Sequence, residues 1–122
     1  MEITNRKAKF EYLIIDTYEA GIELRGTEIK SLRRGSADLR DAFGIIKNNE
    51  AYILNLYIAK YEEGNIFNHD ERRTRKLLLH HHEIQKINNH LKQTGLTLIP
   101  LKIYFKNGKA KRRGHCSFGN PA

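Results

Sequence analysis

The side chains with the widest range of chemistry are the histidines, and four of them lie in one stretch. His80, His81 and His82 are consecutive, and His90 follows eight residues after His82, on about the same face of a helix. Imidazole nitrogens bind zinc, but successive helical residues project about 100° apart, so three in a row cannot converge on one ion. We therefore expect no metal site. A small metal-dependent hydrolase using His81, His82 or His90 is kept only as an alternative.

Other reactive groups indicate no catalytic site. Cys116 is the single cysteine, which excludes an intrachain disulfide and a multi-cysteine metal site, and we expect an inert thiol in an unpacked tail. The acidic pairs Glu62–Glu63 and Asp70–Glu71 fall in a predicted loop and are interpreted as solvated charges. Glycine-rich phosphate loops and nucleophile elbows do not occur. The sequence therefore predicts a protein that is not an enzyme and has no cofactor.

Basic residues interleaved with aromatics suggest nucleic acid as the partner. Lys and Arg neutralise phosphates, Arg also stacks on bases, and aromatic rings on a sheet can stack on unpaired bases. Signatures of the common RNA-binding modules do not occur. The basic segments are Asn5–Phe10, the helix face formed by Lys30, Arg33 and Arg34, Arg72–Lys76, and Lys106–Arg113.

The charge of the chain is concentrated at one end. The 122 residues carry 22 Lys+Arg and 14 Asp+Glu, a formal net charge of +8. Residues 84–122 contain eight basic side chains and no acidic one, so their field favours polyanions. The length allows one domain. Because no apolar run approaches the roughly 20 residues of a membrane helix, and no secretory signal is seen, we expect a cytoplasmic protein without membrane contact. We also expect a monomer.

The elements that must position these residues are mostly strands. Apolar alternation, an Asn-rich turn at 47–50 and Pro100 at an edge or bulge together favour a small, mainly antiparallel barrel with helices outside it. Thr27 is the expected N-cap of the first helix, and Gly35 is its expected terminator. The expected strands are 10–18, 22–25, 42–46, 51–58 and 96–106, the helices are 27–34 and 80–94, and 62–71 is a loop.

Several separate motifs resemble one bacterial family. They occur in the family's order between Asn5 and Lys111, so the resemblance covers nearly the whole chain. The sequence is thereby identified as similar to the SmpB (small protein B) family, the partners of transfer-messenger RNA. The matching stretches are Asn5–Ala8, Ala20–Leu24, Gly26–Arg33, Arg75–His80 and Leu98–Phe105.

The resemblance implies both a fold and a function. The fold would be mainly β, a small antiparallel OB-like barrel with two or three peripheral α-helices, in a single domain of residues 1–111. The function would be binding to the tRNA-like domain of transfer-messenger RNA, support of its alanine charging, and its delivery to stalled ribosomes in trans-translation. A general single-stranded nucleic-acid-binding OB protein is the other binding alternative.

The resemblance also implies RNA-binding positions. Lys111 would neutralise phosphate, Asn5 and Tyr12 would hydrogen-bond or stack, and Glu19 would accept hydrogen bonds from a base edge or ribose, or orient a basic neighbour. Leu78 would pack on an exposed base or merely support the site. With the basic residues near the N-terminus and on the first helix, the predicted RNA-binding residues are Asn5, Arg6, Lys7, Tyr12, Glu19, Lys30, Arg33, Leu78 and Lys111.

The end of the chain departs from the family pattern. After Lys111 the family continues with a further strand and a long basic tail, whereas residues 112–122 do not follow that pattern. We expect these residues to form a disordered tail and the last barrel strand to be missing. RNA binding would then persist, while ribosomal engagement and tagging of stalled peptides would fail.

Overall fold

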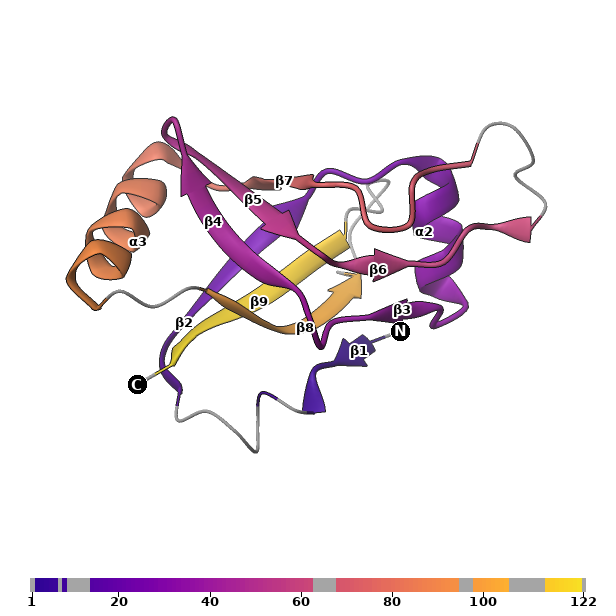
Figure 1. Ribbon diagram of the computed structural model, residues 1–122, viewed down its shortest axis with the longest axis horizontal. Helices are drawn as coiled ribbons and strands as arrows, with labels where there is room; N and C mark the ends of the chain where they lie inside the picture. Colours follow the sequence, from indigo (N-terminus) through magenta and orange to yellow (C-terminus); the bar gives the residue numbers. More distant parts are fainter. Residues whose placement is uncertain are drawn as a thin grey trace.

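In the part of the chain that the structure describes, a seven-stranded antiparallel sheet is accompanied by two helices and a two-stranded sheet (Figure 1). The computed structural model describes residues 2–6, 8, 14–62, 68–94, 98–105 and 114–121. The strand order is β1-β8-β9-β2-β7-β5-β4, and β3 pairs with β6 in the small sheet. The elements are β1 (Glu2–Thr4), β2 (Ile14–Ile22), α2 (Gly26–Arg33), β3 (Ala37–Asp38), β4 (Phe43–Lys47), β5 (Glu50–Leu54), β6 (Tyr57–Ile58), β7 (Arg75–Leu78), α3 (His81–Thr94), β8 (Ile99–Phe105) and β9 (Gly114–Pro121).

The sheet curls so that its edge strand β4 meets the segment just before β8. The Gly44 amide of β4 donates to the Leu98 carbonyl at 2.9 Å, and this pair forms an isolated antiparallel bridge. A Cβ at position 44 would lie 3.0 Å from the Leu98 Cβ, so glycine permits this close approach. The predicted mainly-β antiparallel fold is confirmed. In the described residues, this single bridge links β4 to the segment just before β8, and the two strands form no extended ladder. A closed barrel is therefore not observed.

The hairpin of β4 and β5 forms where the sequence predicted it. Lys47 pairs with Glu50, and the two residues between them, Asn48 and Asn49, have φ angles of 52° and 61°. Two left-handed residues are what a type I′ turn requires, and Asn tolerates that conformation better than most residues. The local sequence therefore determines the register of this hairpin.

The first helix ends as predicted but begins differently. Gly35 follows it with a φ of 72°, as expected of its terminator. The N-cap is Arg25, not Thr27, so that prediction was wrong. The Glu28 carboxylate accepts the Arg25 amide at 2.7 Å, while the Thr27 hydroxyl hydrogen-bonds the Nδ1 of buried His69 at 2.8 Å. Because Glu28 accepts the amide of the N-cap residue, the Thr27 side chain is available to join the helix to a distant loop.

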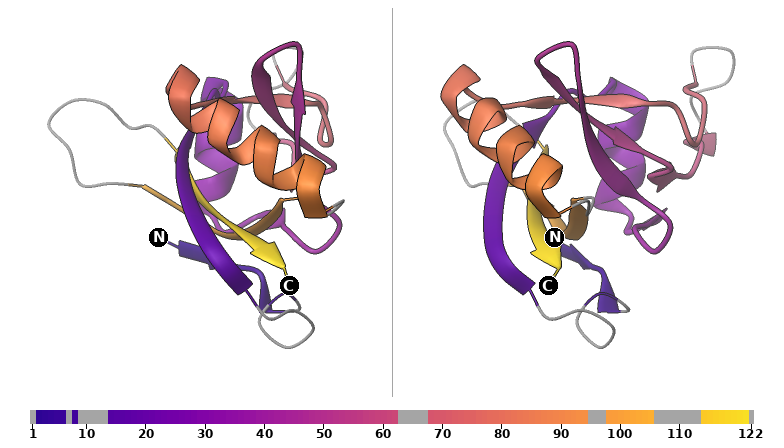
Figure 2. Two further views of the ribbon diagram at one scale, coloured as in Figure 1. Left: turned by 90° about the vertical axis from the view of Figure 1, so that its left-hand side faces the viewer. Right: turned by 60° about the vertical axis from the view of Figure 1, so that its left-hand side comes forward.

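The two helices lie at opposite ends of the curled sheet (Figure 2). The predicted amphipathic helix is confirmed as α3, whose Ile84 and Ile87 are 4% and 0% exposed and join the core. Leu32 of α2 is fully buried at the other end. Apolar side chains from both helices thus form part of one continuous hydrophobic core. None of the described helices is long and apolar enough to cross a membrane.

The C-terminal residues do not form the disordered tail that we predicted. Gly114–Pro121 form β9, which pairs with both β2 and β8 inside the sheet. Cys116 and Phe118 are 0% and 1% exposed, and burial raises the pKa of the Cys116 thiol well above its ordinary value. The strand forms despite weak β-propensity because two neighbours satisfy its backbone and alternate side chains fill the core. The expected loss of the last strand is therefore also wrong.

The strand before β9 follows its predicted pattern. β8 spans Ile99–Phe105, and its register with β9 shifts between Pro100 and Lys102, which is the bulge expected at a proline within a strand. Residues 106–113, between β8 and β9, lie outside the described residues, as do residues 63–67 of the predicted loop.

Candidate nucleic-acid interface

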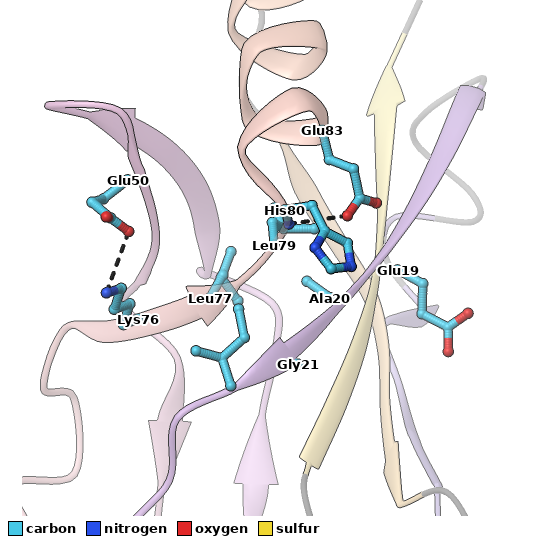
Figure 3. A pocket seen from close by; sticks show the side chains of 10 residues that line it. Glu19, Ala20, Gly21, Glu50, Lys76, Leu77, Leu79, His80 and Glu83 are labelled. Atoms are coloured by element: carbon cyan, nitrogen blue, oxygen red, sulfur yellow. Dashed lines mark hydrogen bonds and ion pairs between the residues drawn. The ribbon is translucent and has the colours of Figure 1, made fainter.

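A pocket of about 670 Å³ opens where β2, β7 and the start of α3 come together (Figure 3). Two of the predicted RNA-binding residues, Glu19 of β2 and Leu78 of β7, contribute to its lining. The strands that carry them are far apart in the sequence and pair at Gly21–Leu78. The lining residues are Glu19, Ala20, Gly21, Glu50, Lys76, Leu77, Leu78, Leu79, His80 and Glu83.

Leu78 is accessible, although its neighbour is part of the core. Its side chain is 37% exposed, whereas Leu77 is 1% exposed. A Cβ built at Gly21, its partner across the ladder, would lie only 3.4 Å from the Leu78 Cβ. Glycine at that position leaves this side of Leu78 uncovered. Leu78 can therefore present an apolar surface to a ligand.

The carboxylates of Glu19, Glu50 and Glu83 line much of this pocket. Glu50 forms an ion pair with Lys76 at 3.3 Å, and Glu83 accepts the His80 amide at 3.1 Å at the start of α3. In Figure 3 the Glu19 carboxylate points away from the Lys76–Glu50 pair. Carboxylates only accept hydrogen bonds, so this wall suits the amino and imino groups of bases better than phosphates.

The basic face of α2 is a separate surface. Lys30 and Arg33 are exposed, as predicted, and stack on aromatic rings: the Lys30 Nζ lies 5.3 Å from the Tyr61 ring centre, and the Arg33 guanidinium lies 5.8 Å from that of Phe105. Arg34 lies 4.5 Å from the same Tyr61 ring. Because α2 lies at the opposite end of the sheet from α3, the structure does not bring Lys30 and Arg33 together with Glu19 and Leu78 (Figure 1).

Asn5 has a different environment from the one expected of a direct RNA contact. Its side chain is 3% exposed, and its amide donates to the carbonyls of Pro100 at 2.9 Å and Leu39 at 3.4 Å. Its Oδ1 accepts the Ala8 amide at 3.3 Å. These groups bind the backbone in this structure, and the hydrogen bonding or stacking of Asn5 with RNA stays a prediction. The adjacent Arg6 is exposed, and Lys7, Tyr12 and Lys111 lie outside the described residues.

Part of the basic cluster at 72–76 is internal, which the sequence analysis missed. Arg75 is fully buried and forms an ion pair with Glu28, and Arg73 reaches the same carboxylate at 2.6 Å. Burial alone would raise the pKa of Glu28, but the hydrogen bonds from Arg73 and the Arg25 amide, with the charge of Arg75, lower it overall. The available signal was alternation, since Arg75 shares its strand face with buried Leu77.

The histidines do not form a metal-binding group among the residues that the structure describes. The rings of His80 and His82 stack with centres 5.7 Å apart and planes 6° from parallel. His81 is exposed and hydrogen-bonds Gln85 within the same helix. In the described part of the chain, no three His, Cys, Asp or Glu side chains group around a common point.

Comparison with known proteins identifies the family. The SmpB protein family model matches residues 2–115. The chain is 58% identical over 107 residues to the SsrA-binding protein of Enterococcus faecalis, covering 88% of this chain and 70% of that protein. It is 54% identical over 108 residues to the SsrA-binding protein of Trichodesmium erythraeum, covering 88% and 69%.

A solved structure agrees with the sequence comparison. It is described as "tmRNA-SmpB: a journey to the center of the bacterial ribosome" and matches this fold with a TM-score of 0.80 at 47% identity, covering 98% of this chain and 81% of that one. The resemblance to this family that the sequence motifs indicated is confirmed, because the family model matches nearly the whole chain. The match includes both the strands of the pocket and the α2 face. The chain belongs to the SmpB family.

Proposed function

We propose that this protein binds the tRNA-like domain of transfer-messenger RNA and supports its delivery to stalled ribosomes in trans-translation. Family membership carries the proposal, since relatives 52–59% identical are SsrA-binding proteins and the matched structure is a tmRNA–SmpB complex with the bacterial ribosome. The protein acts by binding and not as an enzyme. A ribosomal partner supports a cytoplasmic location.

The fold that supports this function is of the OB kind. The curled antiparallel sheet, its bridge from Gly44 to Leu98, and a helix packed at one end are the features in favour. In such folds nucleic acid binds on the outer surface of the strands and the loops beside them. The Glu19–Leu78 pocket lies on that type of surface.

The site residues divide by chemistry. Glu19 accepts hydrogen bonds from base or ribose donors, and Leu78 packs against a base that has left its stack. Arg6, Lys30 and Arg33 provide phosphate contacts, with Lys7 and Lys111 in the same role and Tyr12 as a stacking or hydrogen-bonding group. Asn5 contributes by fixing the N-terminal segment against β8 through Pro100.

Substitution of Glu19 tests the proposal. The change Glu19→Gln makes the protein more positive, yet we expect it to weaken binding to the isolated tRNA-like domain by about 10-fold or more, the usual effect of losing a hydrogen bond to a charged group. Asp41→Asn is the matched control, because Asp41 is exposed and its substitution changes the charge equally. Affinity would be measured by fluorescence anisotropy at fixed salt.

The same assay separates the proposal from a general single-stranded nucleic-acid binder. Unstructured RNA of equal length should compete poorly with the tRNA-like domain. Equal competition would favour the general binder, and tighter binding by Glu19→Gln would show that charge alone governs the interaction.

A further inference from the structure

The strand register places Glu19 in an outward-facing row that crosses four strands. Glu19 of β2 is opposite Ser117 of β9, and Ser117 is in turn opposite Lys102 of β8. Lys102 is opposite Thr4 of β1 at the edge. Directly opposite residues in antiparallel strands point to the same face. Glu19 and Lys102 therefore share one face, about 9 to 10 Å apart across the sheet at their backbones.

The neighbouring residues of the same strands confirm which face this is. Ala20, Cys116 and Ile103 each follow or precede a member of the row by one position, and they are 3%, 0% and 0% exposed. Because side chains alternate along a strand, the core lies under these residues and the row containing Glu19 and Lys102 faces outward.

A second row lies one step along the same face. Leu78 of β7 is opposite Gly21 of β2, Gly21 is opposite His115 of β9, and His115 is opposite Tyr104 of β8. Gly21 contributes no side chain, which leaves the surface low beside Leu78. Tyr104 is thus on the outward face that carries Leu78, and β2, β9 and β8 lie side by side in Figure 1.

Lys102 and Tyr104 form a cation–aromatic pair on this face. The Lys102 Nζ lies 5.3 Å from the Tyr104 ring centre, and both side chains are half-buried. A ring on a sheet surface offers a stacking partner for an unpaired base, and an ammonium beside it can meet the adjoining phosphate. A single nucleotide presents both of these groups together.

We propose that Lys102 and Tyr104 form a second nucleotide subsite of the RNA-binding face, in which an unstacked base packs on the Tyr104 ring and its phosphate lies near Lys102. The inference rests on the proposed function and extends the Glu19–Leu78 surface across β9 to β8. The Lys30–Tyr61 and Arg33–Phe105 pairs do not share this face through the strand register, because their cations belong to α2.

Substitutions at the two positions separate stacking from charge. Tyr104→Leu keeps apolar bulk without an aromatic face, and we expect it to weaken binding to the tRNA-like domain by about 5- to 150-fold, the range found for loss of one base–aromatic stack. Tyr104→Phe keeps the ring and should bind like the original protein. Lys102→Met removes one phosphate contact and should make the slope of log affinity against log salt shallower by about 0.7 to 0.9.

Tyr57→Leu is the matched control. Its ring lies 5.3 Å from the Arg72 guanidinium, the same spacing as in the Lys102–Tyr104 pair, but it belongs to β6 in the small sheet. Its affinity should stay within about twofold of the original protein, as for most surface changes remote from a site. Thermal melting of each variant verifies that the fold is retained.

The outcomes distinguish this inference from the function on which it rests. If the original protein binds the tRNA-like domain and Glu19→Gln weakens binding, but Tyr104→Leu does not, the subsite is wrong and the proposed function stands. If the original protein does not prefer that RNA, both fail. Should Tyr104→Leu lose its fold, an unchanged salt slope in Lys102→Met would overturn the subsite, and a shallower slope would support it.

Discussion

At the scale of single residues, Leu77 and Leu78 are adjacent in β7 but have opposite surroundings, 1% and 37% exposed. We expect Leu78→Ala to change the free energy of unfolding by less than about 1 kcal/mol and to weaken RNA binding. Leu77→Ala, the matched control, should destabilise the fold by about 2 to 5 kcal/mol because it leaves a cavity.

Urea unfolding and the fluorescence anisotropy of bound RNA, measured on the same preparations, test these two substitutions. Equal destabilisation by the two substitutions would mean that Leu78 supports the fold and does not meet the RNA. The contrast could not be read from the sequence, since two consecutive leucines in a strand are chemically identical and differ only in the face they occupy.

Residue type also failed to reveal which polar groups are internal. Arg75 and Asn5 were both interpreted as parts of basic or RNA-binding segments, yet they are 0% and 3% exposed. Each is buried with its partners supplied by distant segments, Glu28 of α2 for Arg75 and Pro100 of β8 for Asn5. Contacts of this kind depend on the tertiary arrangement, which residue spacing along the chain does not encode.

At the scale of elements, the Glu28 carboxylate joins α2 to β7 through Arg73 and Arg75. Burial would raise the pKa of Glu28, but its hydrogen bonds and the nearby guanidinium lower it below the ordinary carboxyl value. Its stabilising contribution is therefore complete above that ordinary value, about 4.3, and is lost as pH falls through the lower pKa of the folded state. We expect Glu28→Gln to cost about 3 to 5 kcal/mol at pH 7, since Arg75 would remain buried without its partner.

Urea unfolding at pH 7, 5 and 3.5 measures this contribution. Asp38→Asn is the control, because hydrogen bonds from Arg40 also lower the pKa of Asp38, but that pair is exposed and screened by water and salt. An original protein whose stability falls no more steeply with acid than that of Glu28→Gln would contradict the assigned role of the buried carboxylate.

Local patterns predicted most of the elements. Helix α3, the Asn48–Asn49 hairpin and the bulge beside Pro100 follow from periodicity and turn chemistry within a few residues. The strands β1, β3, β7 and β9 and the N-cap of α2 were not predicted, because tertiary partners override weak local preference there. β9 is stabilised by β2 and β8 on either side, and Thr27 is oriented toward His69.

At the scale of the whole molecule, the net charge of +8 predicts a strong salt dependence of RNA binding. Five phosphate contacts would give a slope of log affinity against log salt of about −4.5, or about −3.5 where the RNA is single-stranded. Because Arg73 and Arg75 are engaged by Glu28, we do not count them among these contacts. Titrations with the tRNA-like domain at several salt concentrations measure the slope, and a nearly flat dependence would contradict the basic surfaces assigned here.

The place of β9 in the sheet has a consequence for how the chain folds during its synthesis. β9 is the last of the described strands in sequence but lies between β2 and β8, so residues far apart in the sequence, such as Ala20 and Cys116, must meet before the sheet is complete. Pairings between such distant residues form slowly, because a long loop must close first. Until residues 114–121 have left the translating ribosome, β2 and β8 each keep an open edge, and the nascent chain passes through a stage exposed to chaperones, proteases and aggregation.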